Sequence, residues 1–228
     1  MTDLAARFGK ALVIAPHADD EVLGCGALLA ALSRAGLAPE VAIVSQGHPP
    51  DYPAGQVAAL KAEAASAHAI LGVAATHWLG LPAARLDTLP HADLNAAIGR
   101  LVAQVRPDTL LLPFPGDIHL DHQLVFRSGL VAARPAGPHH PRLILCYETL
   151  SETNWNAPAL TPAFAPTLFA DATATLPAKL EAFGAYASQV RPDPHERSLS
   201  AVQALARLRG ATVHLPVAEA FVLVRAIC

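Results

Sequence analysis

Short apolar runs alternate with longer alanine-rich stretches through the first two thirds of the chain. A short run that is apolar at every position is typical of a strand covered on both faces, whereas a longer amphipathic stretch is typical of a helix. Regular alternation of the two predicts a mostly parallel sheet with helices on both of its faces. We expect strands at 11–15, 41–45, 76–79 and 109–113, and helices at 21–36, 56–71, 94–105 and 119–133.

The last third of the chain departs from this alternation. A loop at 135–142 precedes a strand at 143–147, and the irregular stretch 151–166 is longer than a simple connection needs to be. Loops of that length in a compact domain often bind ligands. No repeat, low-complexity tract or linker divides the chain, so we predict a single α/β domain over residues 1–228. The remaining elements are expected to be helices at about 176–188 and 194–208 and a closing strand at 220–225.

Composition and charge exclude several classes of protein. Of the 228 residues, 53% are hydrophobic and 15% are charged, which supplies a core and leaves no charged tract of the disordered kind. The formal net charge is −3 and the lysines and arginines are scattered, so no nucleic-acid partner is expected. No apolar run reaches the roughly 18–20 residues of a membrane span, and residues 1–10 lack the apolar segment of a signal peptide. We therefore expect a cytoplasmic protein that acts on a small molecule, and homo-oligomerisation stays open.

The first group of candidate catalytic residues directly follows the first predicted strand. Residues 16–21 read PHADDE, so one imidazole and three successive carboxylates open the next helix. Such a concentration of negative charge is unfavourable unless something positive binds to it. One helical turn brings His17 and Asp20 onto one face, where a nitrogen and an oxygen ligand suit Zn²⁺, while Asp19 projects differently and is free to act as a base. The alternative is that Asp19 caps the helix and its neighbours favour the positive helix N-terminus.

A second group follows the strand at 109–113 in the same way. Residues 119–122 read HLDH, with His119 and His122 one helical turn apart and Asp121 between them. Taken alone, these could be surface histidines on a helix. Both groups come after a strand and open a helix, so in a parallel sheet they lie at the edge where open α/β sheets bind ligands. Three protein ligands and one open position are typical of a catalytic zinc site.

The two groups lie in stretches that resemble the signatures of the PIG-L/LmbE-like zinc-dependent N-acetylglucosaminyl de-N-acetylases. Residues 13–30 (VIAPHADDEVLGCGALLA) are similar to the first signature and residues 113–122 (PFPGDIHLDH) to the second. Weaker likeness extends over most of the chain. The resemblance implies a Rossmann-like three-layer α/β sandwich that binds one Zn²⁺ per chain, with other divalent metals left open. It also implies hydrolysis of the N-acetyl group of an amino sugar or of an amino-sugar conjugate, in which a nucleotide attachment stays open.

The resemblance further implies a role for each residue of the two groups. The family's zinc ligands match three of them: His17, Asp20 and His122. Asp19 matches the general base, which takes a proton from a metal-activated water as that water attacks the amide carbonyl. His119 matches a histidine that stabilises the oxyanion or protonates the leaving amine, and Asp121 matches the carboxylate that orients this histidine.

The sequence departs from the family's pattern in two respects. Ala18 and Leu120 stand where prolines are usual, which concerns the stiffness of the loops rather than metal binding. Relatives often carry a substrate-binding arginine after the second strand, but residues 46–84 contain none, and Lys61 is the only lysine there. The family's substrate anchor therefore has no counterpart at its usual place.

Substrate contacts are accordingly expected from other side chains near the same edge of the sheet. Carboxylates and amides bind sugar hydroxyls, and an aromatic face packs against the apolar side of a sugar ring. The irregular loop offers Glu152 and Asn154, and the alternative for its tryptophan is that it packs the loop against the core. The predicted contacts are His48, Lys61, Tyr147, Glu148 and Trp155.

Two other functions stay open at this point. The same machinery could serve an amidase that acts on a thiol conjugate or another small-molecule conjugate. A catalytically silent sugar-binding domain could share the fold. The presence of Asp19 and His119 argues against a silent domain, because binding alone requires no base.

Overall fold

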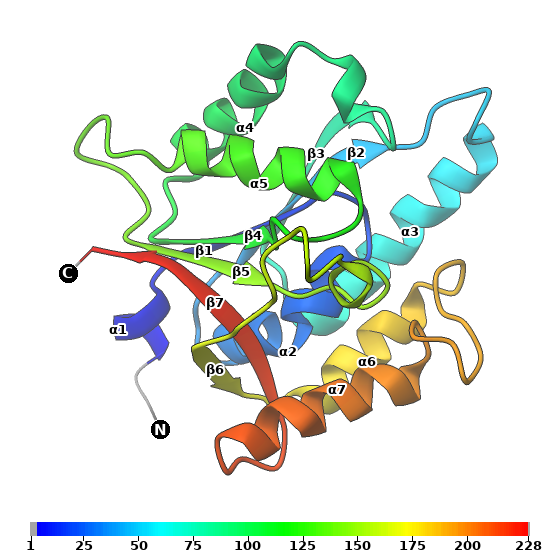
Figure 1. Cartoon of the computed structure of the whole chain (residues 1–228), viewed down its shortest axis with the longest axis vertical. Helices are drawn as coiled ribbons and strands as arrows, with labels where there is room; N and C mark the ends of the chain where they lie inside the picture. Colours follow the sequence, from blue (N-terminus) through cyan, green and yellow to red (C-terminus); the bar gives the residue numbers. More distant parts are fainter. Residues whose placement is uncertain (1–3, 228) are drawn as a thin grey trace.

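The computed structural model describes residues 4–227 and contains one seven-stranded sheet with helices on both faces (Figure 1). The strands are β1 (Ala11–Ala15), β2 (Glu40–Gln46), β3 (Ala75–Pro82), β4 (Thr109–Pro113), β5 (Leu143–Tyr147), β6 (Leu168–Asp171) and β7 (Ala218–Ala226). The α-helices are α1 (Leu4–Phe8), α2 (Asp20–Arg34), α3 (Ala54–Leu71), α4 (His91–Val105), α5 (Leu120–Ala132), α6 (Leu176–Ala185) and α7 (Leu199–Thr212). Short 3₁₀ turns occur at Leu86–Thr88 and Thr153–Trp155.

The order of the strands changes direction at β1. The sheet runs β3-β2-β1-β4-β5-β7-β6, so the chain first moves outward from β1 through β2 to β3 and then continues on the other side of β1 with β4. β1 is parallel to both β2 and β4. The crevice at the carboxyl ends of β1 and β4 is therefore a topological switch point, the usual ligand site of an open α/β sheet.

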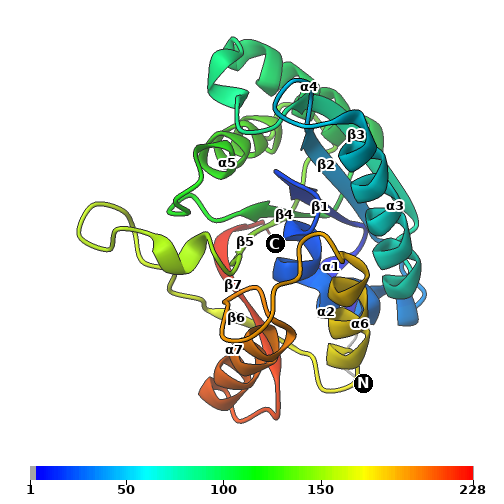
Figure 2. The same ribbon diagram turned by 90° about the vertical axis from the view of Figure 1, so that its right-hand side faces the viewer.

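Three layers of secondary structure build the predicted sandwich. α4 and α5 cover one face of the sheet, and α2, α3 and α6 cover the other, with α7 packed against α6 and β7 (Figures 1 and 2). β1 and β4 are buried at every position because both of their faces are covered. Successive side chains of β1 enter different cores: Val13 packs on the side of α2, and Leu12 and Ile14 pack on the side of α4 and α5.

The structure confirms the mostly parallel α/β fold and corrects its last third. α7 begins at Leu199 rather than at residue 194, because the Ser198 hydroxyl accepts a hydrogen bond from the Ala201 N–H and so caps the helix there. α6 ends at Ala185 rather than at residue 188. β7 pairs with β5 and β6 in antiparallel fashion. The edge strand β6 was not expected, since four residues, none of them buried, are too few to show a period.

Within residues 4–227, no helix is long and apolar enough to cross a membrane. Residues 1–3 lie outside the described residues. The expectation that residues 1–10 form no signal peptide therefore stays a prediction. The cytoplasmic location and the lack of a nucleic-acid partner also stay predictions.

α2 lies close against the end of β5 because position 24 is a glycine. A Cβ atom on Gly24 would lie 2.2 Å from Cδ2 of Tyr147. Tyr147 is completely buried, and its hydroxyl donates a hydrogen bond to the carbonyl oxygen of Ile14 at 2.9 Å. The tyrosine therefore has no room to move away from an added methyl group.

We predict that Gly24→Ala lowers the free energy of unfolding by about 1–3 kcal/mol, the usual cost of overpacking a core. Urea unfolding monitored by circular dichroism measures this change. The matched control is Gly99→Ala in α4, where an added Cβ meets nothing within 4 Å. In that control, the free energy of unfolding should rise by roughly 0.5–1 kcal/mol, because alanine has the higher helix propensity. A Gly24→Ala protein as stable as the control would show that α2 and β5 can separate without cost.

Candidate active site

Both groups of candidate catalytic residues lie at the switch point between β1 and β4. The first occupies the turn between Ala15, the last residue of β1, and α2. The second occupies the turn between Pro113, the last residue of β4, and α5. One ligand atom each from His17, Asp20 and His122 lies within 4.8 Å of the others. Residues about a hundred positions apart in the chain therefore converge, as expected from the parallel sheet.

The ligand atoms of this group face one another around one carboxylate oxygen. Oδ2 of Asp20 lies 3.4 Å from Nδ1 of His17 and 3.2 Å from Nε2 of His122. The second nitrogen of each imidazole contacts another carboxylate. Nε2 of His17 lies 3.0 Å from the carboxylate of Asp121, and Nδ1 of His122 lies 2.8 Å from the carboxylate of Asp117. A histidine that binds metal through one nitrogen usually donates its other N–H in this way. Nε2 of His122 is buried and has no hydrogen-bond partner, so it is available as a ligand.

The charges of this group favour a bound cation. Burial by itself would raise the pKa of Asp20, but His122 and His17 hold it well below its usual range. Burial would also lower the pKa of His122, but Asp20 and Asp117 raise it to about 10. The carboxylates thus favour positive charge at a largely buried place, and a proton or a metal ion can supply it. The donor set of two imidazoles and one carboxylate fits Zn²⁺.

Asp19 has a backbone conformation that few residues other than glycine adopt, with φ 114°. Its N–H donates a hydrogen bond to Oε2 of Glu21 at 3.0 Å. Oε1 of Glu21 in turn accepts hydrogen bonds from the Tyr186 hydroxyl at 2.5 Å and from Nε2 of His68 at 3.1 Å. Asp19 stands at the N-cap position of α2, but its side chain makes no capping hydrogen bond. The alternative that its carboxylate caps the helix is therefore wrong, and the side chain lines the adjoining cavity instead.

The structure corrects the predicted contact between Asp121 and His119. The Asp121 carboxylate binds His17 and accepts hydrogen bonds from the N–H groups of Ala84 and Leu86 at 2.7 and 3.2 Å. His119 contacts Asp121 only through the backbone, where its Nδ1 accepts a hydrogen bond from the Asp121 N–H at 3.1 Å. The sequence motif could not distinguish these arrangements, because they depend on which way the carboxylate turns.

His119 is consequently a neutral imidazole with its proton on Nε2. Nδ1 accepts a hydrogen bond, so it is the unprotonated nitrogen. Burial and the neighbouring His17 and His122 lower the pKa of His119 to about 4. The rings of His17 and His119 lie 4.6 Å apart, so this donor is next to the candidate metal ligands. The alternative of two surface histidines fails for His122, which is completely buried.

A cavity of about 550 Å³ opens beside these residues. Its walls come from the turns after β1, β2, β3 and β4, from the first turns of α3, and from the β5–β6 and α6–α7 connections. Sequence reasoning missed Arg197 in the connection between α6 and α7, since no spacing relates it to either motif. Burial raises the pKa of Glu152 to about 7 against the opposing effect of His122. The charged and titratable side chains that line the cavity are His17, Asp19, Asp20, Tyr52, His119, Glu152, Arg191 and Arg197.

None of the five predicted substrate contacts lines this cavity. Tyr147 belongs to the core beneath α2. Glu148 is engaged by Arg209, whose Nε and Nη2 donate to the two carboxylate oxygens at 2.8 and 2.6 Å. Lys61 lies over the ring of Trp78, with its Nζ 5.1 Å from the ring centre. These side chains have partners of their own, which a sequence pattern does not reveal.

The other two predicted contacts lie on the surface. Nε2 of His48 contacts the carbonyl oxygen of Gly80 at 3.2 Å. Trp155 is 62% exposed, so the alternative that it packs the loop against the core is wrong as well. Its Nε1 donates hydrogen bonds to both carboxylate oxygens of Glu196, at 2.9 and 3.1 Å. The tryptophan thus joins two surface loops.

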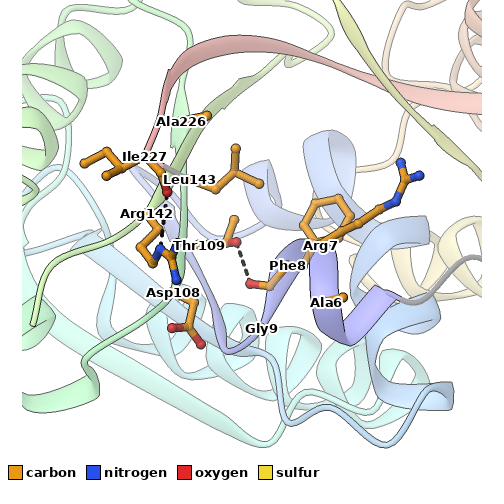
Figure 3. A pocket seen from close by; sticks show the side chains of 10 residues that line it. All are labelled: Ala6, Arg7, Phe8, Gly9, Asp108, Thr109, Arg142, Leu143, Ala226 and Ile227. Carbon is orange, nitrogen blue, oxygen red and sulfur yellow. Dashed lines mark hydrogen bonds between the residues drawn. The ribbon is translucent and has the colours of Figure 1, made fainter.

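A second hollow, of about 430 Å³, lies at the opposite edge of the sheet (Figure 3). Two of its polar side chains donate to backbone carbonyls: the Thr109 hydroxyl to that of Phe8 at 2.5 Å, and Nε of Arg142 to that of Ile227 at 3.2 Å. Asp108, its one carboxylate, accepts a hydrogen bond from the Lys10 N–H. The groups that could hold a metal are all at the other edge among the described residues, so chemistry rather than shape locates the candidate site.

The family model of the GlcNAc-PI de-N-acetylases (PIG-L) matches residues 12–133, which is more than half of the chain. The chain belongs to the PIG-L family. The matched segment contains both groups of candidate catalytic residues. No curated protein matches the sequence.

Solved structures similar to this PIG-L family chain confirm its fold. A conserved protein from Thermus thermophilus has a TM-score of 0.79 and 25% identity, and the match covers 96% of each chain. The N,N'-diacetylchitobiose deacetylase from Pyrococcus horikoshii has a TM-score of 0.75 and 20% identity over 97% of this chain and 86% of its own. GalB, the 4-carboxy-2-hydroxymuconate hydratase from Pseudomonas putida, has a TM-score of 0.76 and 18% identity over 96% of this chain and 97% of its own.

The geometry offers two groups of three candidate metal ligands that share His17. One adds Asp20 and His122, and the other adds His119 and Asp121. We predict that the purified PIG-L family chain binds about one zinc ion through the first group. His122→Ala should then lose most of its zinc while His119→Ala keeps it, as measured by elemental analysis after dialysis. Circular dichroism provides the folding control. Full zinc content in His122→Ala together with loss in His119→Ala would assign the metal to the second group.

Proposed function

We propose that this chain is a zinc-dependent hydrolase that removes the N-acetyl group from an amino sugar or an amino-sugar conjugate. The observation that carries the proposal is the convergence of three ligand atoms beside a carboxylate, Asp19, that has no capping role. Membership of the PIG-L family supports the reaction, since the family model describes de-N-acetylases. The likeness to a diacetylchitobiose deacetylase agrees with a sugar substrate.

The proposed metal ligands are His17, Asp20 and His122. Three protein ligands leave one position open for substrate or water, as in catalytic zinc sites. When bound, a zinc ion polarises the amide carbonyl and lowers the pKa of a water molecule to about 7. Asp121 and Asp117 hold the two imidazoles in orientation through their second nitrogens.

Asp19 is the proposed general base. Its carboxylate lines the cavity next to the metal ligands, and the hydrogen bond from its N–H to Glu21 holds its unusual backbone conformation. It accepts a proton from the attacking water as the water oxygen bonds to the amide carbon. As the C–N bond breaks, the same proton passes to the leaving nitrogen. Acetate and a free amine are the products.

His119 is the proposed donor to the oxyanion. Of the two roles implied by the family resemblance, a neutral imidazole with a proton on Nε2 favours hydrogen bonding over proton transfer, because its pKa of about 4 leaves no second proton to give at neutral pH. A fixed neutral donor aimed at developing charge stabilises a transition state without reorganisation. This assignment leaves Asp19 as the carrier of the proton.

We predict that Asp19→Asn retains zinc and loses most of its activity. Asparagine preserves the size of the side chain and removes the basic oxygen, so kcat should fall on the order of 10²–10⁴-fold with little change in KM. Release of free amine from a panel of N-acetylhexosamines and their glycosides measures the reaction. A near-normal kcat in this variant would place the base elsewhere, and an inactive zinc-loaded wild type on the whole panel would contradict the proposed substrate class.

A second prediction separates donation by His119 from proton transfer. His119→Ala should lower kcat on the order of 10²–10³-fold, the usual effect of removing one oxyanion donor. His119→Gln should recover part of this loss, because a glutamine amide can donate a hydrogen bond but cannot transfer a proton at neutral pH. Zinc content serves as the control for both variants. Equal losses in the two variants would mean that His119 acts as an acid.

A further inference from the structure

Arg197 brings a guanidinium to the catalytic cavity from a part of the chain that no motif connects with it. It lies between α6 and α7, near the carboxyl end of the sequence. Its side chain is 22% exposed and makes an ion pair with Oδ2 of Asp19. Residues 46–84, where the family's substrate arginine was expected, contain no arginine. The tertiary structure thus supplies a cation that the sequence lacks at the usual place.

The bonding of Arg197 is incomplete. Its Nη2 contacts Asp19 and donates to Oε1 of Gln189 at 3.3 Å, while its Nε is buried and has no hydrogen-bond partner. In Arg209, by contrast, both Nε and Nη2 donate hydrogen bonds, to the two carboxylate oxygens of Glu148 at 2.8 and 2.6 Å. A buried donor without an acceptor is unfavourable. In its present position, the Arg197 guanidinium therefore has an unpaired Nε donor. An acceptor with two oxygens could bind Nε and Nη2 together.

Hydrogen bonds on both sides hold the backbone at Arg197, which fixes the point from which its side chain reaches the cavity. Its N–H donates to Nδ1 of His195 at 3.0 Å, and its carbonyl oxygen accepts from the N–H of Arg191 at 3.1 Å. The preceding residue, Glu196, accepts hydrogen bonds from the side chains of Asn154 and Trp155. The loop that contains Asn154 and Trp155 and the loop before α7 are thereby joined next to Arg197.

We propose that Arg197 is the substrate anchor of this enzyme and that it binds an oxyanion, a phosphate or a carboxylate, carried by the amino-sugar substrate. The inference rests on the proposed function. A guanidinium edge with two donors matches an oxyanion in geometry as well as in charge. Binding the substrate draws Arg197 away from Oδ2 of Asp19. That oxygen then faces the cavity and is free to accept a proton from water.

The experiment compares Arg197→Gln with Arg191→Gln in the zinc-loaded protein. Arg191 lines the same cavity and carries the same charge, but its Nη1 donates only to the carbonyl oxygens of Ser188 and Val190, at 2.8 and 3.1 Å. Three substrates are used: the methyl glycoside of N-acetylglucosamine, its carboxymethyl glycoside and N-acetylglucosamine 1-phosphate. The last two differ in the source of the oxyanion.

Arg197→Gln should raise KM for one or both anionic substrates on the order of tenfold to a hundredfold and leave KM for the neutral glycoside nearly unchanged. Arg191→Gln should leave KM for all three substrates nearly unchanged. The anionic substrate with the larger loss identifies the oxyanion that Arg197 prefers. Equal losses on all three substrates would overturn the inference and make Arg197 a brace for Asp19. Equal effects of the two variants would also overturn it, since only the general charge of the cavity would then matter.

A binding measurement separates failure of this inference from failure of the proposed function. Calorimetric titration with glucosamine 1-phosphate and with glucosamine needs no turnover. The wild type should bind the phosphorylated sugar more tightly than the unphosphorylated one, and Arg197→Gln should lose that preference. If the wild type hydrolyses none of the substrates, the proposed function fails, and this preference still decides the role of Arg197. A wild type without any preference for the phosphorylated sugar would overturn the inference.

Discussion

The carboxylate of Glu21 is completely buried, and the geometry of the candidate active site depends on it. A buried carboxylate is unfavourable unless donors surround it. Here the donors come from three places in the chain: the N–H of Asp19, the ring of His68 in α3 and the hydroxyl of Tyr186 just after α6. Because the first of these belongs to the proposed base, satisfying the carboxylate also fixes the left-handed turn that presents Asp19 to the cavity. Stability of the core and position of the base are therefore coupled.

The three histidines of the site differ in their expected roles because their hydrogen-bond partners differ. His17 and His122 each have a carboxylate on the nitrogen remote from the shared Asp20 oxygen, which leaves the other nitrogen oriented to act as a metal ligand. His119 has a backbone N–H in the corresponding place, so it stays neutral and keeps a proton to donate. Only the contact between His17 and Asp121 joins residues distant in sequence, since the partners of His119 and His122 lie two and five residues away.

The fold by itself does not determine the reaction. A deacetylase and a hydratase both have this architecture at TM-scores of about 0.75. What favours amide hydrolysis here is the set of side chains at the switch point, together with the family match over residues 12–133. Outside that segment, the β5–β6 and α6–α7 connections contribute Glu152 and Arg197 to the lining of the cavity. These connections are where substrate specificity can vary without change to the chemistry.

The sequence by itself determined the alternation of strands and helices and the edge at which both motifs lie. Residues such as His17 and His122 directly follow predicted strands, and parallel strands bring their carboxyl ends together whatever the loops do. The tertiary structure alone decided which side chains bond to one another. Asp121 turns to His17 rather than to His119, Tyr147 fills the space left by Gly24, and Arg197 reaches Asp19 from the far end of the chain. Periodicity reports the face on which a residue lies, whereas a partner distant in sequence depends on loop paths and packing, which leave no period to read.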